Sequence, residues 1–205
     1  MSQALALQGH SVVLHVRSEK FSSDILFHIA EEYGIDPLFK VKAWKIGNFK
    51  GSCYIYGFLS GFYAWFSLSS CAYCRSLPAS VVTSLFGMQT IIELHQPLTS
   101  TLPAWFISLL RCVWKCSRKV RFITITQALK RFLESIYPEC RMLIKVAPDA
   151  ADEHPWDVRP IIFSQDDLKI NVGYCGHLYS GKGVELILKL APLCPWANFH
   201  VVGGT

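Results

Sequence analysis

Apolar and polar positions recur along this chain with two different periods, which predicts strands that alternate with helices. Short runs rich in β-branched residues, such as "SVVLHV" and "VRFITIT", are typical of strands. Longer runs with apolar residues three or four positions apart, such as "QALKRFLESIY", indicate amphipathic helices. Elements in this alternation predict an α/β protein with a parallel sheet and helices on both faces.

A polar stretch with two prolines interrupts the alternation at 149–169 and is typical of an interdomain linker. We therefore predict a Rossmann-like N-terminal domain over 1–152, a linker over 153–169, and the first βαβ unit of a second Rossmann-like domain over 170–205. The chain begins in what looks like the first helix of a βαβ fold. We expect the first domain to lack its first strand and the second to be truncated.

The composition excludes an intrinsically disordered chain, because 51% of the 205 residues are hydrophobic and only 17% are charged. The mean hydropathy of +0.29 is high for a soluble protein. The net charge is +5, and basic residues gather in 111–121. This excess suits anionic partners such as phosphates or acidic lipid, although a solvated basic face explains it equally well.

One segment, 51–74, carries no charged residue and is long enough to span a bilayer. Its glycine, serine and tyrosine content lowers its hydropathy, so a buried helix that leads into a strand explains it as well. The helix expected over 102–117 has two similar interpretations, a core helix or one that docks on a membrane surface. The N-terminus lacks the basic and apolar regions of a signal peptide, which favours a cytoplasmic location.

The eight cysteines lie mostly within apolar runs, which predicts buried, reduced thiols. Cys71 and Cys74 form a CxxC pair, and Cys112 and Cys116 lie one helical turn apart. The paired spacing of a zinc ribbon or finger is missing, so we expect no metal site.

The stretch "NVGYCGHLYSGKGVELI" at 171–187 reads as a strand, a glycine-rich loop and the start of a helix. Backbone amides in such a loop approach anions closely, and a helix N-terminus favours negative charge. Lys182 adds a positive charge, so a diphosphate is the expected ligand. The alternative is an exposed lysine at a helix start. The loop is not a Walker motif, because Gly183 follows Lys182 in place of Ser or Thr.

A second group of polar residues follows predicted strands in the first domain. His95 comes after "MQTIIEL", and Arg75 and Ser76 come after "SSCAYC". Ligands of open parallel sheets bind beyond the carboxyl ends of the strands, so these residues are expected at a binding edge. The alternatives are a histidine that caps a strand end and, for Asp149, a turn former.

Several of these motifs together resemble family 4 glycosyltransferases, the retaining class with two Rossmann-like domains (GT-B). "YCGHLYSGKGVELIL" resembles the start of the C-terminal domain in that family, and "KVAPDAAD" is similar to the segment that closes its N-terminal domain. "IIELHQP" resembles the family's strand followed by a histidine at the interdomain cleft, and "AYCRS" and "ALALQGHSVVLHV" also have counterparts there. The resemblance extends over nearly the whole chain.

The resemblance implies an enzyme that transfers a sugar from a nucleotide-diphospho-sugar to an acceptor hydroxyl with retention of configuration, in cell-surface or lipid-linked glycan synthesis. It implies a saccharide or lipid-linked acceptor, no metal, no tightly bound cofactor, no nucleic acid partner, and peripheral contact with the inner face of a membrane. The residues that it implicates are His95 as the catalytic-site residue, Lys182, His177, Gly176 and Gly183 as donor-phosphate contacts, and Arg75, Ser76 and Asp149 in the cleft.

Two positions depart from the family pattern. His177 stands where an arginine is usual, and it binds phosphate as a cation only when protonated. Ala150 replaces a glycine that forms a tight turn in the family. The family's first glycine-rich loop and its paired glutamates have no counterpart in 1–205, so we expect this chain to be inactive alone. The alternatives are a non-catalytic binding or scaffold protein of the same fold, and a protein that spans a membrane through 51–74.

Overall fold

The computed structural model describes residues 1–98, 102–149 and 169–204. Contacts between residues divide the chain into two units, Met1–Ala150 and Ala151–Thr205. Most of the predicted linker over 153–169 lies outside the described residues, as does Ala150. Both units contain helices and parallel strands, so the predicted α/β class is confirmed.

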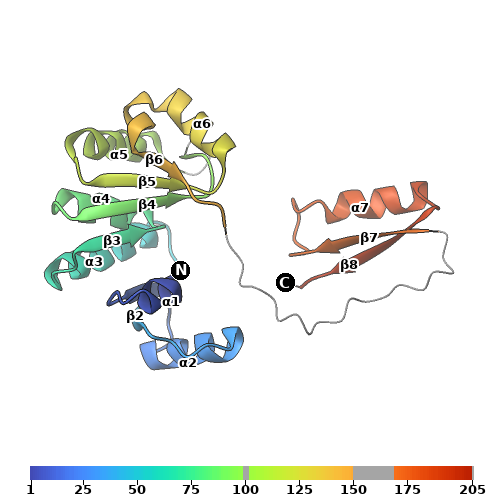
Figure 1. Cartoon of the computed structure of the whole chain (residues 1–205), viewed down its shortest axis with the longest axis horizontal. Coiled ribbons are helices and arrows are strands. Elements are labelled where there is room, and N and C mark those ends of the chain that lie inside the picture. The colour runs from blue at the N-terminus through green and yellow to red at the C-terminus, as the bar shows by residue number, and fades with distance from the viewer. Residues whose placement is uncertain (99–101, 150–168, 205) are drawn as a thin grey trace. The chain divides into compact units, whose positions relative to one another are not determined.

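The main sheet of the first unit has four parallel strands in the order β3-β4-β5-β6 (Figure 1). Its strands are β3 (Cys71–Cys74), β4 (Gln89–Leu94), β5 (Val120–Thr124) and β6 (Ile144–Val146). The connections contain α4 (Leu77–Leu85), α5 (Ala104–Cys116), α6 (Gln127–Ile136) and the 3-10 helix η2 (Pro138–Leu143). Parallel neighbours need such crossovers, because one chain must return to the same end of the sheet before each new strand. The strands therefore all end at the same edge.

A second, two-stranded parallel sheet precedes the main one. Its elements are α1 (Ser2–Leu7), β1 (Val13–Arg17), α2 (Ser22–Tyr33) and β2 (Lys40–Trp44), and α3 (Ser52–Phe66) then leads to β3. No hydrogen-bonded ladder joins β1 or β2 to the four-stranded sheet in the described residues. The link is α3, where the Tyr56 hydroxyl donates to the carbonyl of His15 at 2.8 Å.

Helices α3 and α4 approach each other closely because glycine occupies the contact face of α3. A Cβ atom on Gly57 would lie 2.4 Å from Cβ of Pro78, and one on Gly61 would lie 2.8 Å from Cβ of Val82. Real atoms do not approach so closely, so only glycine fits at these two positions without a shift of backbone.

The core of the first unit lies on one face of the four-stranded sheet. Along β4 and β5 the even-numbered residues are buried, with Ile92 fully buried and Phe122 1% exposed, while odd-numbered neighbours keep contact with solvent. Leu110 of α5 and Leu133 of α6 pack against this face. The prediction of helices on both faces is therefore wrong for β4 and β5, since their burial alternates as in a sheet covered on one side.

Helix boundaries follow the sequence rules in most places. The Ser76 and Thr126 hydroxyls cap α4 and α6, and Gly34 ends α2 in the left-handed region at φ 60°. Helix α2 is an exception, because Phe21 precedes it without a side-chain cap and the serines and aspartate that follow lie inside the helix. The 3-10 helix η2, which begins at Pro138, was not predicted.

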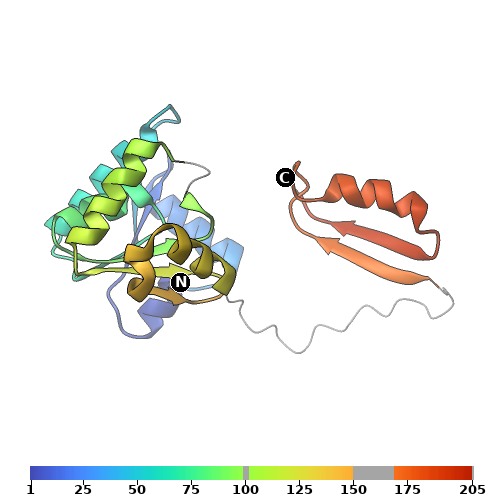
Figure 2. The ribbon, with the colours of Figure 1, turned by 90° about the horizontal axis from the view of Figure 1, so that it is seen from above.

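The second unit is one βαβ unit. It consists of β7 (Ile170–Cys175), α7 (Val184–Leu190), the 3-10 helix η3 (Ala191–Leu193) and β8 (Ala197–Val202), with β7 parallel to β8. Figures 1 and 2 both show α7 alongside the two strands. Large apolar side chains such as Ile170, Leu188 and Val202 are more than half exposed in this unit.

The structure bears on both membrane interpretations, of segment 51–74 and of helix 102–117. Segment 51–74 forms α3 and β3, and no helix in the described ranges is long and apolar enough to cross a bilayer. Helix α5 buries Phe106, Leu110 and Trp114 in the core, as the core interpretation of 102–117 predicted.

The prediction of buried thiols is wrong for most of the cysteines. Cys74 and Cys140 are buried and Cys194 is partly buried. The exposed thiols are those of Cys53, Cys71, Cys112, Cys116 and Cys175. Apolar runs misled the prediction because each of these elements buries only one face, and these five side chains lie outside it.

Candidate functional site

Five polar side chains gather where strands of the main sheet end. Tyr73 lies on β3 and Arg75 directly after it, Glu93 lies on β4 with His95 one residue beyond the strand, and Asp149 follows β6. Parallel strands bring these segments to one edge, as expected for His95 and Arg75. Asp149 also lies there. We call this group the carboxyl-edge cluster.

Glu93 is the centre of the carboxyl-edge cluster. Its carboxylate is 13% exposed, and its two oxygens lie 3.0 Å from His95 Nε2 and 3.7 Å from Arg75 Nε. The register explains the arrangement: Tyr73 lies opposite Ile91, so the next outward positions, Arg75 and Glu93, are neighbours across β3 and β4. A carboxylate so placed lies within ion-pair distance of side chains from two different segments.

The Nε2 atom of His95 faces the Glu93 carboxylate. This atom is buried and lies close to Glu93, but outside hydrogen-bond geometry, and it has no other hydrogen-bond partner among the described residues. Buried polar atoms in folded proteins are nearly always hydrogen-bonded, so such an atom calls for a specific explanation. The side chain as a whole is 29% exposed, so other atoms of His95, and not Nε2, face solvent.

Tyr73 is held in its neutral form by the carboxyl-edge cluster. Burial raises the pKa of Tyr73 to about 12, and the charge of Glu93 and its hydrogen bond with the hydroxyl add to the effect. A phenol that donates to a carboxylate resists loss of its proton, because the anion would repel the acceptor. Tyr73 therefore orients Glu93 as a donor.

Three members of the cluster could hold a cation. Ligand atoms of Glu93, His95 and Asp149 all lie within 4.8 Å of one another. The guanidinium of Arg75 already lies beside Glu93 and opposes a second positive charge there. The arrangement fits hydrogen-bond recognition of a polar ligand better than it fits a metal ion.

Ser76 caps a helix, and no contact between Ser76 and the carboxyl-edge cluster is seen in the described residues. Its hydroxyl accepts from the Ala79 amide at 3.5 Å and caps α4. That contact accounts for a serine at this position, and a place for Ser76 in a cleft stays a prediction.

In the second unit, two of the predicted phosphate contacts lie beside one exposed tyrosine. The ammonium of Lys182 lies 5.3 Å from the centre of the Tyr179 ring, and the His177 ring lies 5.5 Å from the same ring. The Tyr174 hydroxyl donates to the carbonyl of His177 at 2.7 Å, which fixes the start of the loop. Gly183 at φ 88° begins α7, and the backbone takes a left-handed turn that favours glycine.

Sequence reasoning missed Tyr73 and Glu93, although a signal for both was present. Tyr73 and Arg75 are two residues apart, as are Glu93 and His95, and residues two apart on a strand share a face. The two-residue period of a strand, applied to "AYCRS" and "IIELHQP", predicts that all four side chains lie on one face of the sheet.

No protein-family model matches the chain, and no curated protein matches it. The likeness to family 4 glycosyltransferases therefore stays a prediction that rests on the residues themselves.

Proposed function

We propose that this chain carries part of a GT-B glycosyltransferase that uses a nucleotide-diphospho-sugar donor and retains the configuration of the sugar. The observation that supports this most directly is the carboxyl-edge cluster itself, in which Glu93 lies 3.0 Å from His95 Nε2 and 3.7 Å from Arg75 Nε where the strands of a parallel sheet end. Ligands of open parallel sheets bind at this edge.

The chemistry of the carboxyl-edge cluster matches a sugar. Sugar hydroxyls donate and accept hydrogen bonds at once, and they need both kinds of partner close together. Glu93 and Asp149 offer acceptor oxygens, whereas Arg75 offers donors and His95 offers a ring nitrogen of either kind. In this proposal His95 contacts the transferred sugar, and Glu93 and Tyr73 position His95.

The second unit would bind the diphosphate of the donor. Lys182 is an exposed cation beside a glycine-rich loop, and the diphosphate that leaves during transfer gains negative charge. Positive charge placed in advance at that point stabilises the transition state. His177 would strengthen the contact only when protonated. Neither role needs a metal ion or a tightly bound cofactor, and the donor is a substrate.

A binding experiment on the whole chain tests the proposal. Titration of ¹⁵N-labelled protein with UDP-glucose and GDP-mannose should shift amide signals of 93–95 and of 176–183 for at least one donor. His95→Ala should abolish the shifts at 93–95 and leave those at 176–183. If neither sugar nucleotide, nor UDP or GDP alone, shifts either set of signals at millimolar concentration, the proposal is wrong.

The phosphate contact has its own matched pair of variants. Lys182→Ala should weaken UDP or GDP binding about tenfold, the loss typical of a charge-assisted hydrogen bond. Lys189→Ala removes an equal charge from the last turn of α7 and should leave the affinity unchanged. Equal affinity for the two variants would remove Lys182 from the proposed site.

A further inference from the structure

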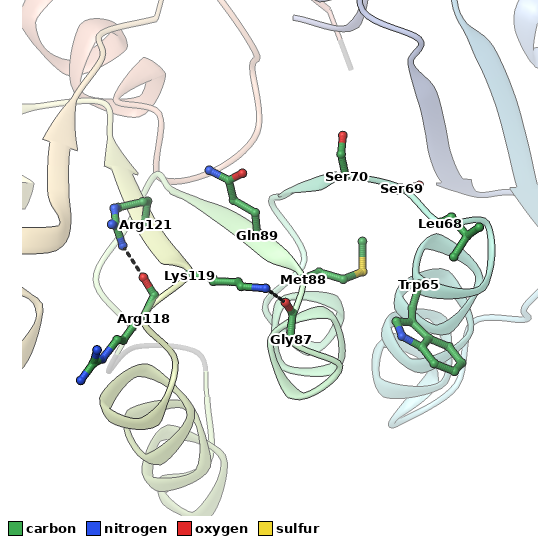
Figure 3. A pocket seen from close by; sticks show the side chains of 10 residues that line it. All are labelled: Trp65, Leu68, Ser69, Ser70, Gly87, Met88, Gln89, Arg118, Lys119 and Arg121. Carbon is green, nitrogen blue, oxygen red and sulfur yellow. Dashed lines mark hydrogen bonds between the residues drawn. The ribbon is translucent and has the colours of Figure 1, made fainter.

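The amino edge of the main sheet, opposite the carboxyl-edge cluster, carries a pocket of about 530 Å³ (Figure 3). The segments that enter β3, β4 and β5 form its floor, and the end of α3 forms one wall. The residues that line it are Trp65, Leu68, Ser69, Ser70, Gly87, Met88, Gln89, Arg118, Lys119 and Arg121. This set includes three cations and no carboxylate, so the pocket favours an anion.

Figure 3 shows how the cations line one side of this cationic pocket. The Lys119 ammonium donates to the carbonyl of Gly87 at 2.9 Å, and an Arg121 guanidinium nitrogen donates to the carbonyl of Arg118 at the same distance. Each group has further N–H donors beyond the one used, because an ammonium has three and a guanidinium five. Backbone carbonyls thus hold two of the cations in place without neutralising them.

The other side of the pocket continues into an exposed aromatic surface on α3. Phe58, Phe62 and Phe66 lie one turn apart, and successive rings stack at 6.1 and 6.4 Å. Trp65, which lines the pocket, stacks on Phe86 at 4.6 Å. Exposure of these five side chains runs from 39% for Phe86 to 72% for Phe66. We call them, together with Leu68, the α3 aromatic surface.

Leu68 is the most exposed member of this surface. Its side chain is 90% exposed, and its backbone adopts φ 57°, a left-handed conformation that few residues other than glycine and asparagine favour. The turn that follows α3 therefore projects a large apolar side chain from a strained position. Leu68 belongs to the pocket wall as well, so apolar and cationic surfaces meet there.

We propose that the α3 aromatic surface and the cationic pocket together dock the protein on an anionic lipid bilayer. The aromatic rings and Leu68 would enter the boundary between headgroups and acyl chains, and lipid phosphates would pair with Arg118, Lys119 and Arg121. An amphipathic surface with this division of groups binds bilayers through apolar burial and electrostatic attraction together.

The occupant is a bilayer and not a second copy of this chain. In a symmetric dimer whose axis passes through the cationic pocket, the three cations of each copy would lie close to those of the other. Like charges repel at such an interface, whereas an anionic lipid surface neutralises them. A surface with five exposed, mutually stacked aromatic rings also calls for an explanation, because exposed apolar surface of this kind usually marks an interaction site.

The docking surface differs from the one that the sequence suggested. Most of the apolar face of 102–117 faces the core in α5, whereas four of the five rings of the α3 aromatic surface belong to α3. The basic segment 111–121 does contribute, since three of its cations reach the pocket. The inference does not depend on the proposed glycosyltransferase function, because the two surfaces lie at opposite ends of the strands.

Vesicle flotation of the whole chain tests the docking surface. We expect binding to vesicles of phosphatidylcholine mixed with phosphatidylglycerol, weaker binding to phosphatidylcholine alone, and release as salt is raised. Phe66→Ser should reduce binding about tenfold or more, as expected for a phenylalanine that loses its apolar environment. Arg118→Gln should reduce binding about fivefold, the effect of one basic residue near an anionic surface.

Three further variants keep the test decisive. Leu68→Asn removes the apolar side chain but suits the left-handed turn, so binding should fall while thermal stability is kept or rises. Phe27→Ser on α2 and Arg131→Gln on α6 remove an exposed ring and an exposed cation elsewhere and should leave binding unchanged.

The inference is overturned by any of three results. These are no binding to anionic vesicles, equal losses in the control variants, or dimerisation that Phe66→Ser abolishes in a protein that binds no vesicles. Sugar-nucleotide binding should be the same in all of these variants, so failure of this inference and failure of the proposed function are distinguishable.

Discussion

The imidazole of His95 and the carboxylate of Glu93 lie 3.0 Å apart, and one residue, Leu94, separates them in the sequence. The extended chain at the end of β4 turns both side chains to one face, and Leu94 points into the core on the other. A step of one residue thus separates a packing position from a position that faces solvent and ligands. The adjacent strand β3 repeats this arrangement with Tyr73 and Arg75 around the buried Cys74.

Glu93→Gln should lower the pKa of Tyr73 from its value of about 12 toward the ordinary value of 10. The substitution removes a negative charge that disfavours tyrosinate, although burial, the larger cause, remains. The measurement is an ultraviolet titration of tyrosinate, with the Tyr73 signal identified by difference from Tyr73→Phe. Glu134→Gln on α6 is the control and should leave the titration unchanged. A pKa of Tyr73 that is the same with and without Glu93 would contradict the geometry of the cluster.

Acid should destabilise the first unit through His15. Burial, and then the charge of Lys42, lower the pKa of His15 below 6.5. The neutral ring accepts a hydrogen bond at Nδ1 from the Trp44 indole at 3.2 Å, and protonation removes that acceptor. The unfolded chain therefore binds the proton more readily than the folded one. The free energy of unfolding has its full value above pH 6.5 and falls as the pH drops below it.

Urea unfolding at pH 7.5 and 5.5 measures this effect of His15. His15→Asn should reduce the loss of stability between the two pH values, since the group that titrates is absent. His28→Asn removes an exposed histidine that pairs with Glu32 on α2 and should keep the loss seen in the parent chain. An equal loss in the parent and in His15→Asn would show that other groups cause it.

Gly57→Ala should destabilise the first unit even though alanine favours helices. The added methyl group would meet Pro78 Cβ and the Ala79 backbone at 2.4 and 2.7 Å. Overpacking of this kind costs about 1–3 kcal/mol, which exceeds the gain of about 1 kcal/mol in helix propensity. Gly47→Ala, where no atom lies within 4 Å, should change the free energy of unfolding little. Equal stability of the two variants in urea would mean that α3 and α4 do not cross as described.

Thiol reactivity should divide the cysteines by exposure. Burial raises the pKa of Cys74 to about 11 and that of Cys140 to about 12, so neither forms the reactive thiolate near pH 8. Brief treatment with Ellman's reagent followed by mass spectrometry should find Cys112 and Cys175 modified first. Modification of Cys74 and Cys140 should require denaturant. Rapid modification of Cys140 in the folded protein would contradict its place in the core.

Much of the local structure was determined by the sequence alone, because it depends on neighbouring residues. Periodicity predicted each strand and α-helix, and glycines follow two of the helices, Gly34 after α2 and Gly87 after α4. The order of residues after each strand also predicted that His95 and Arg75 would reach one edge. Parallel crossovers make that outcome nearly independent of side-chain detail.

Only the tertiary structure decided which face of each element is buried and which groups meet. Packing between elements decides the burial of one sheet face, the exposure of five thiols and the exposure of the aromatic rings of α3. Periodicity predicts which face of an element is apolar, but not which other element covers that face. The register of β3 on β4 likewise decided that Arg75 lies beside Glu93, and no local sequence pattern encodes this long-range pairing. The sequence therefore determined the elements and their common edge, while packing and register decided the cluster at one end of the sheet and the aromatic and cationic surface at the other.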